Sequence, residues 1–297
     1  MNYKQLPTIT PKQKEIIDLV FKFRFINRHQ IQRLFNHKDA RRINTWLRDL
    51  VNKNYLGRIY STKLLENTKP AIYYLGNNGI IFIRSKKGEE YQAEYEHLDF
   101  KHMKKFYEDK HASQTFINHC VAISEFYTQF KEFERASKQD TLEYDVETKT
   151  EMWITKQLHH YPDEDFQEIK TSIPDLYIEK VKNPYNKTLQ IETFFLELFD
   201  PHVPRYGILY KIKEFIKLKE EGSWKQYAGL DDKFPTIFLI FPHYRKINMV
   251  IDKIREQLNG SYESDDITIQ TTTYQKAITE KITNNSIWTK IILSSTS

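Results

Sequence analysis

The chain has 297 residues, of which 39% are hydrophobic, 14% aromatic and 29% charged, and this composition excludes a chain that is disordered throughout. Its single cysteine, Cys120, excludes an internal disulfide and a metal site built from several cysteines. No apolar stretch approaches the roughly 20 residues of a membrane span, so we expect a cytoplasmic protein without membrane contact.

The net charge of +5 is unevenly distributed along the chain. Residues 1–60 contain 13 Lys and Arg against 4 Asp and Glu, a net charge of +9, which leaves −4 for the remainder. A basic module joined to a mildly acidic body favours contact between the N-terminal part and a polyanion.

Capping residues and apolar spacing predict the elements of the N-terminal part. Thr10, Asn27 and Asp39 are each placed to cap a helix, and Gly57 is expected to adopt a positive φ just after the third one. Three helices followed by a hairpin predict a winged helix-turn-helix over residues 1–85. The expected elements are helices over about 11–25, 28–35 and 40–52, strands over 56–60 and 71–75, and a closing helix over 77–85.

The third helix of this module is expected to read the major groove of DNA. Its apolar residues form one stripe and leave Arg and Asn outside, where Arg can donate two hydrogen bonds to guanine and Asn can pair with adenine. The hairpin and the flanking cations would hold phosphates. The alternatives are a solvated polar face or a surface that binds another protein. The expected DNA-binding residues are Arg28, Arg41, Arg42, Asn44, Thr45, Arg48, Arg58 and Lys63.

Residues 86–109 are expected to form a linker, and residues 110–297 an α/β domain with a mixed sheet, which makes the fold class of the whole chain α+β. The tail after residue 265 has strand propensity over 267–274 but no assigned place. The expected elements are helices over about 110–136, 206–220 and 245–258, and strands over 142–150, 175–179, 189–199 and 236–241.

Two carboxylates of this domain could carry chemistry. Asp175 begins an apolar strand, and Glu197 lies inside an apolar stretch, where an unpaired carboxylate would be costly to bury. Neighbouring antiparallel strands would bring both side chains to one place, where they could hold Mg²⁺ or Mn²⁺ as phosphodiester cleavage requires. Alternatively, Asp175 caps a turn and Glu197 pairs with a lysine such as Lys211.

Several short motifs, in their order and spacing, resemble the replication-relaxation family of plasmid and mobile-element proteins. The resemblance covers about residues 10–258 and implies a winged-helix DNA-binding module joined to a domain similar to the PD-(D/E)xK nuclease fold. The motifs that carry it are Phe23–Ile31, Tyr73–Gly76, the His111 helix, the Glu147 strand, Ile173–Asp175, Phe195–Leu198, the Lys211 helix and Pro235–Phe241.

In that nuclease fold, Asp175 and Glu197 would be metal ligands and Glu147 a further catalytic carboxylate. The motif lysine is expected two residues after the Glu, where this chain has Phe199. Lys211 is the best candidate for a lysine that has moved to the following helix. This departure favours a nuclease-like domain with lost or weak activity, and the alternative is a metal-dependent endonuclease or nickase that uses Asp175, Glu197 and Lys211.

The sequence therefore predicts a DNA-binding protein of a plasmid or mobile element, acting in replication, in DNA relaxation or transfer, or in transcription control. Its expected partner is double-stranded DNA. A homodimer stays open, because no heptad run identifies an interface. A third interpretation is an adaptor that docks proteins through the winged helix and has no affinity for DNA.

Overall fold

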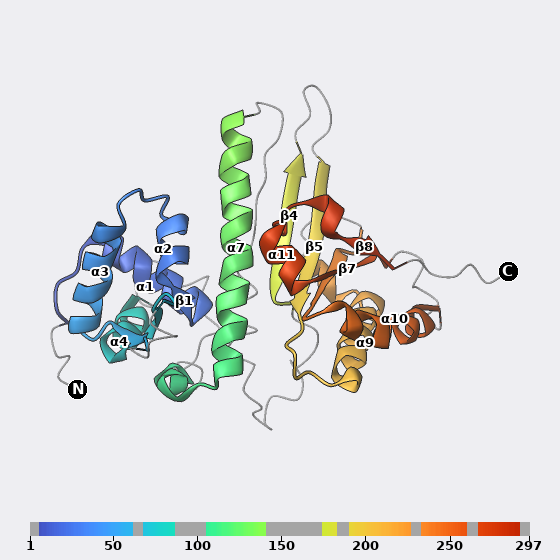
Figure 1. The fold of residues 1–297 in the computed structure, drawn as a ribbon, viewed down its shortest axis with the longest axis horizontal. Coiled ribbons are helices and arrows are strands. Elements are labelled where there is room, and N and C mark those ends of the chain that lie inside the picture. The colour runs from blue at the N-terminus through green and yellow to red at the C-terminus, as the bar shows by residue number, and fades with distance from the viewer. Residues whose placement is uncertain are drawn as a thin grey trace. The chain divides into compact units, whose positions relative to one another are not determined.

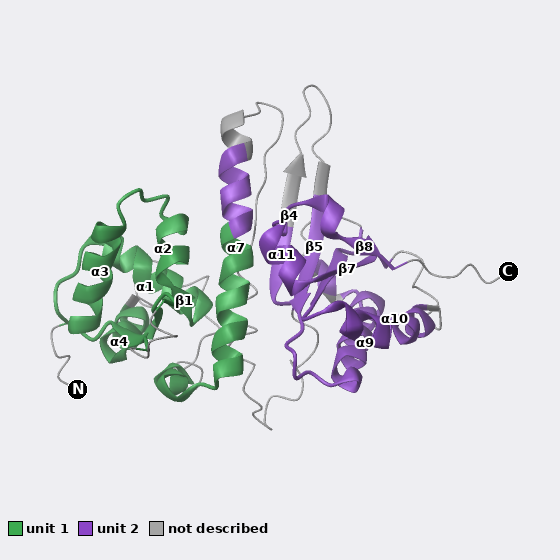
Figure 2. Cartoon of the chain, viewed as in Figure 1, with its two compact units in different colours: residues 1–128 green, residues 129–297 purple. Residues whose placement is uncertain are grey.

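The computed structural model describes residues 6–61, 68–86, 105–140, 174–182, 190–226, 233–259 and 267–291. Within these residues helices accompany a three-stranded and a five-stranded sheet, which confirms the expected mixture of α and β structure (Figure 1). The chain divides into two compact units, residues 1–128 and 129–297 (Figure 2). None of the helices in the described part of the chain is long and apolar enough to cross a membrane.

The first unit begins with three helices at the predicted positions. The side chains of Thr10, Asn27 and Asp39 accept hydrogen bonds from backbone N–H groups of the first turns, and this confirms the three predicted caps. One stripe of each helix is buried, as the apolar spacing requires. The helices are α1 (Pro11–Phe23), α2 (Arg28–Leu34) and α3 (Ala40–Asn52).

An antiparallel sheet follows, with β3 (Ile72–Leu75) between β1 (Ile26–Asn27) and β2 (Leu56–Ile59). The predicted positive φ at Gly57 is wrong, because Asn54 takes this conformation, with φ 56°, and Gly57 lies in β2. A Cβ atom on Gly57 would lie 2.1 Å from the ring of Tyr74 on the paired strand. Glycine is therefore required here by the ring that covers it.

The predicted closing helix is present as α4 (Asn77–Lys86). The 3₁₀ helix η1 (Phe106–His111) carries Asp109, whose side chain forms a fully buried ion pair with Arg24. The long helix α7 (Gln114–Asp140) follows, and the division between the two units falls within it (Figure 2).

The second unit contains a five-stranded mixed sheet in the order β4-β5-β6-β7-β8, which confirms the expected mixed sheet. β5, β6 and β7 are parallel, and the two outer strands pair antiparallel with their neighbours. The strand predicted over 142–150 lies outside the described residues. The strands are β4 (Leu176–Lys182), β5 (Gln190–Leu198), β6 (Thr236–Phe241), β7 (Ile269–Thr273) and β8 (Thr289–Lys290).

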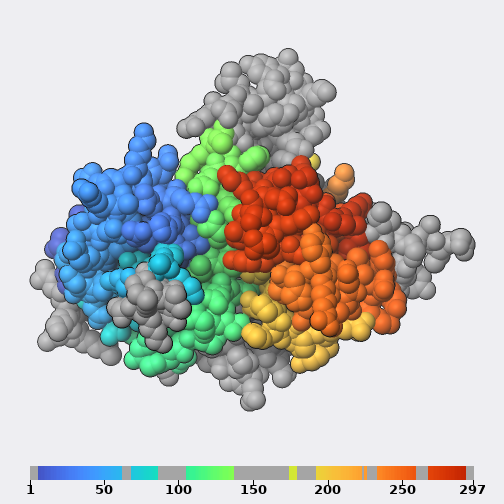
Figure 3. Space-filling model, in the orientation of Figure 1, coloured from blue at the N-terminus to red at the C-terminus, as the bar shows by residue number. Residues whose placement is uncertain are grey.

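The tail that the sequence leaves without a place completes this sheet. It forms β7 and then α11 (Tyr274–Thr279), η4 (Asn285–Ile287) and β8. In the space-filling view these residues (red) lie against those of α10 (Tyr244–Asn259, orange) (Figure 3). Trp288 follows η4 and stacks on Phe238 of β6, with the ring centroids 4.1 Å apart.

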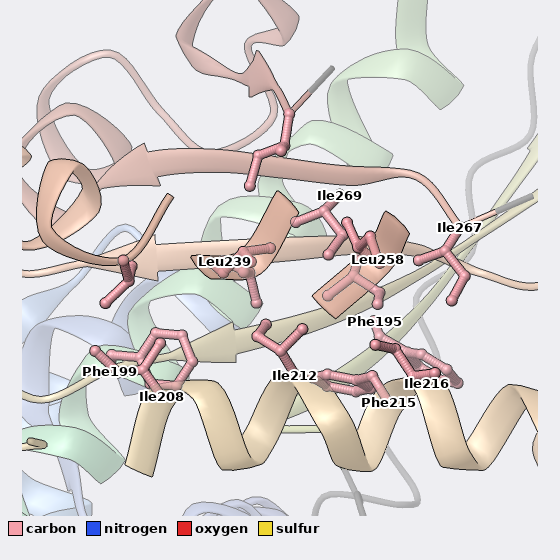
Figure 4. Packing of buried hydrophobic residues seen from close by; sticks show 14 of the residues in the cluster. Phe195, Phe199, Ile208, Ile212, Phe215, Ile216, Leu239, Leu258, Ile267 and Ile269 are labelled. Carbon is pink, nitrogen blue, oxygen red and sulfur yellow. The ribbon is translucent and has the colours of Figure 1, made fainter. Parts of the chain in front are cut away.

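The main core of the second unit lies between the sheet and the helices α9 (Arg205–Glu220) and α10. Ile208, Ile212 and Phe215 of α9 point toward the strands, where Phe195 belongs to the same cluster (Figure 4). Residues of α9 at three- and four-residue spacing thus bury one side of the helix and leave the other side outside the core.

Candidate nucleic-acid interface and carboxylate site

A groove of about 680 Å³ lies along α3, at the start of α2 and beside the hairpin of β2 and β3. Four of its lining residues are cationic, and none of the described residues that line it is Asp or Glu. We call these four residues the groove cations. No ion pair joins any of them to a described acidic residue. The groove cations are Arg28, Arg48, Arg58 and Lys69.

Arg28 connects the start of α2 to α3 within this groove. Its guanidinium donates a hydrogen bond to Asn44 Oδ1 at 3.3 Å, and its second terminal nitrogen lies 3.2 Å from His29 Nε2. Partial burial, together with the charges of Arg28 and Arg33, lowers the pKa of His29 below its usual value. The ring is therefore neutral at pH 7 and can accept a hydrogen bond from Arg28.

The outer side of α3 carries polar residues at positions that share one helical face. Arg41, Thr45 and Arg48 are exposed, and Asn44 between them is half-buried. The Thr45 hydroxyl donates to the Arg41 carbonyl at 3.0 Å, so this face belongs to regular helix. Three donors and one amide are thus presented together on one helical face.

Arg42 lies on a different side of α3. Its guanidinium carbon is 5.8 Å from the centroid of the Trp46 ring. Asp49, seven residues further on the same side, accepts a hydrogen bond from Gln13 of α1 at 2.7 Å. This side of α3 is therefore directed toward α1 and not toward the groove.

The predicted DNA-binding residues accordingly fall into three sets. Arg28, Asn44, Arg48 and Arg58 line the groove, whereas Arg41, Arg42 and Thr45 are exposed on α3 without lining it. Lys63 lies outside the described residues.

Three aromatic or imidazole side chains of the groove, those of His29, Tyr60 and Tyr73, were not among the predicted residues. The centroid of the Tyr60 ring lies 4.6 Å from the guanidinium carbon of Arg58. Strand alternation was the available signal for Tyr60, because residues 58 and 60 of a strand point to the same side.

Long-range contacts hold α2 from the side of α7. Gln30 is buried and donates to the carbonyl of Val121 at 2.8 Å. Arg33 donates to both carboxylate oxygens of Glu125, at 2.7 and 2.8 Å. These partners are more than 90 residues apart in the chain, so no local sequence pattern identifies them.

In the second unit, the structure brings together the two predicted carboxylates. Leu176 of β4 pairs with Leu196 of β5, and continuing this antiparallel register by one residue sets Asp175 opposite Glu197. Both are buried, with 1% and 7% of their surface exposed. The backbone N–H of Leu198 donates to Asp175 Oδ2 at 2.7 Å.

Lys211 of α9 completes this cluster. Its Nζ atom lies 3.4 Å from Glu197 Oε2, and both side chains are largely buried. The alternative in which Glu197 pairs with Lys211 thus describes the structure, and the same contact places the predicted lysine beside the predicted acid. Among the described residues no group of three His, Cys, Asp or Glu could hold a metal ion. Glu147 lies outside those residues.

A family model described as replication-relaxation matches residues 17–233, well over half of the chain. The chain belongs to the replication-relaxation family. The match includes both the groove and the carboxylate cluster, and it ends just before β6. No curated protein and no solved structure is significantly similar to this member of the replication-relaxation family. Membership indicates a role in the replication or relaxation of a plasmid or mobile element, and hence an interaction with DNA.

Proposed function

We propose that this protein binds double-stranded DNA through residues 1–85, folded as a winged helix-turn-helix. In this proposal α2 and α3 are the helix pair, α3 enters the major groove, and the hairpin of β2 and β3 is the wing. The groove cations carry the proposal, because four cations without an acidic neighbour in the groove adjoin the polar face of α3. Such a surface attracts phosphates strongly.

Some groups on this surface would contact bases, and others would contact phosphates. Arg41 and Arg48 can each donate two hydrogen bonds to a guanine, and the Asn44 amide, held by Arg28, can pair with an adenine. Arg58 of the hairpin would contact the phosphate backbone, which sets register without reading sequence.

The decisive experiment compares arginines of the same helix. Labelled duplex DNA carrying a site selected with the wild-type chain is titrated with the Arg41→Ala/Arg48→Ala variant and with the Arg42→Ala variant. We expect the first to lose about 1–3 kcal/mol of binding free energy for each arginine. Arg42→Ala should bind nearly as the wild type does, because Arg42 lies toward Trp46. Equal affinity of all three proteins would contradict the placement of α3 in the groove of DNA.

In the wider proposal the protein acts on DNA of a plasmid or mobile element, in replication, in relaxation or transfer, or in transcription control. A homodimer would bind two half-sites spaced by about one helical turn, roughly 34–36 Å. Light scattering of the protein with a selected duplex would distinguish one bound copy from two.

We further propose that the second unit is a nuclease-like domain, similar to the PD-(D/E)xK fold, whose activity is weak or lost. The observation behind it is a cluster of three residues: Asp175 just before β4, Glu197 on β5 and Lys211 on α9. The competing proposal is an active metal-dependent endonuclease or nickase built on the same residues.

Two opposed carboxylates are a donor set that suits Mg²⁺ or Mn²⁺, which binds through one or two carboxylates and keeps several waters. Asp175 and Glu197 would hold the cation, and Lys211 would stabilise negative charge on a phosphate. A bound cation supplies a nucleophilic water and charge stabilisation at the phosphorus.

Nicking of supercoiled plasmid separates the two proposals. Metal-dependent nicking by the wild type, abolished in Asp175→Ala, would establish the endonuclease. The absence of cleavage over a wide range of metals and substrates supports a degenerate domain.

A further inference from the structure

The helix α9 carries two exposed tyrosines that the functions proposed above do not use. Tyr206 and Tyr210 are 77% and 61% exposed, the two highest values among large hydrophobic side chains of the described residues. They are four residues apart and therefore lie one above the other on the same side of the helix.

This side of α9 is not a part of the core. The side chains of Ile208, Ile212 and Phe215 point from the other side of the helix into the sheet (Figure 4). The two tyrosines therefore lie on the side of α9 that is turned away from the sheet of its own unit. Packing within the unit does not account for them.

Cations flank the tyrosines. Arg205 and Lys213 are exposed, and neither forms an ion pair with a residue that the structure describes. The sequence from Arg205 to Lys213 contains no acid, and the next residue, Glu214, is buried. The first two turns of α9 thus present aromatic rings and positive charge together.

We propose that this stripe of Arg205, Tyr206, Tyr210 and Lys213 binds single-stranded DNA. Tyrosine rings offer faces on which bases of any sequence stack, and the cations contact the backbone between them. Four residues of helix separate the rings by about 6 Å along the axis. This exceeds the roughly 3.4 Å between bases of a duplex strand, so the stripe suits an unstacked strand.

A single strand fits this surface better than a protein partner does. The exposed positions combine aromatic rings with cations and contain no exposed acid, so the surface complements a polyanion such as the backbone of a single strand. Replication, one of the roles that the family indicates, separates the strands of a duplex.

The test measures binding of a labelled oligothymidylate to the full chain by fluorescence anisotropy at low salt. We expect Tyr206→Ala/Tyr210→Ala to weaken this binding by about thirtyfold or more, since stacking on both rings is lost. Tyr206→Phe/Tyr210→Phe should bind as the wild type does, because the rings remain. Tyr244→Ala, which removes another exposed tyrosine on α10, is the matched control and should have no effect.

Two results would overturn the proposal. One is a wild-type chain that does not bind the oligothymidylate, including one that instead self-associates through this stripe. The other is an unchanged affinity of the double alanine variant. The affinity of the double alanine variant for duplex DNA should stay at the wild-type value. A failure of the single-strand proposal is therefore distinguishable from a failure of duplex binding by the proposed winged helix.

Discussion

The groove of the first unit and the carboxylate cluster of the second unit differ in whether their charged side chains form ion pairs. The groove cations make no ion pair with a described acid. In the cluster, Glu197 and Lys211 are largely buried and neutralise each other. A surface that meets a polyanion has to keep its cations open, whereas buried charges have to be paired. The cations of the groove therefore stay available to an anionic ligand, whereas the lysine of the cluster already contacts an acid.

The largest effect is expected where a buried pair is broken. Asp109→Ala leaves the Arg24 guanidinium fully buried without its counter-charge. We expect the free energy of unfolding of the first unit to fall by about 3–5 kcal/mol, measured by chemical denaturation. Burial raises the pKa of Asp109 to about 6 against the opposing effect of Arg24, so the carboxylate is charged at pH 7.5, where the measurement should be made.

The control for this substitution removes both charges. Arg24 lies over the rings of Phe106 and Phe116, at 5.3 and 4.8 Å from their centroids. Arg24→Met/Asp109→Leu should therefore recover much of the lost stability through apolar packing. A single Asp109→Ala variant as stable as the wild type would show that buried Arg24 does not need the Asp109 carboxylate.

A second prediction distinguishes residues of the groove that recognise bases from residues that contact phosphates. Asn44→Ala should cost about 1–3 kcal/mol of discrimination at one base pair, because one bidentate contact is lost. Arg58→Ala should instead weaken all duplexes by a similar factor. Binding to a panel of single-base variants of the selected site measures both. A uniform loss in Asn44→Ala would contradict its role as a base-reading residue.

The hairpin offers an effect of similar size, on stability instead of on binding. Gly57→Ala places a Cβ atom against the ring of Tyr74, and such overpacking costs about 1–3 kcal/mol. Thermal unfolding measures the cost. Gly57→Ala combined with Tyr74→Ala should be less destabilised than the sum of the two single variants, whereas additivity would mean that the ring does not cover Gly57.

The smallest effect concerns pH. In the free protein the pKa of His29 is lowered by partial burial, Arg28 and Arg33. A bound phosphate would raise this pKa, so binding takes up a proton and affinity for duplex DNA should rise as the pH falls below neutrality. The rise should be less than about tenfold per pH unit, since one group takes up at most one proton. His29→Gln should bind with a flatter pH profile, and an unchanged profile would assign the effect elsewhere.

Local sequence patterns predicted the elements whose bounds depend on neighbouring residues, such as helix caps and apolar strands. The caps at Thr10, Asn27 and Asp39 and the strand at 236–241 are where the sequence places them. The position of Asp175 opposite Glu197 was also predictable, because two apolar strands that follow closely in the sequence favour an antiparallel pair.

The remainder depends on contacts between distant residues. No local pattern around Arg24 predicts its partner Asp109, which lies 85 residues away in the sequence. Gln30 likewise donates to Val121, 91 residues away. Asn54, and not Gly57, takes the positive φ, and glycine is required at residue 57 because the Tyr74 ring of the neighbouring strand fills the space above it. Tertiary packing decides such positions, and no local pattern reports it.

The salt dependence of duplex binding tests the central proposal most directly. The logarithm of the binding constant is measured against the logarithm of salt concentration for the wild type and for a variant in which all four groove cations are replaced by alanine. If each cation contacts a phosphate, the variant should lose about 3 to 4 units of slope, while its circular dichroism stays that of the folded chain. A folded variant with the slope of the wild type would contradict the proposal that the groove binds DNA.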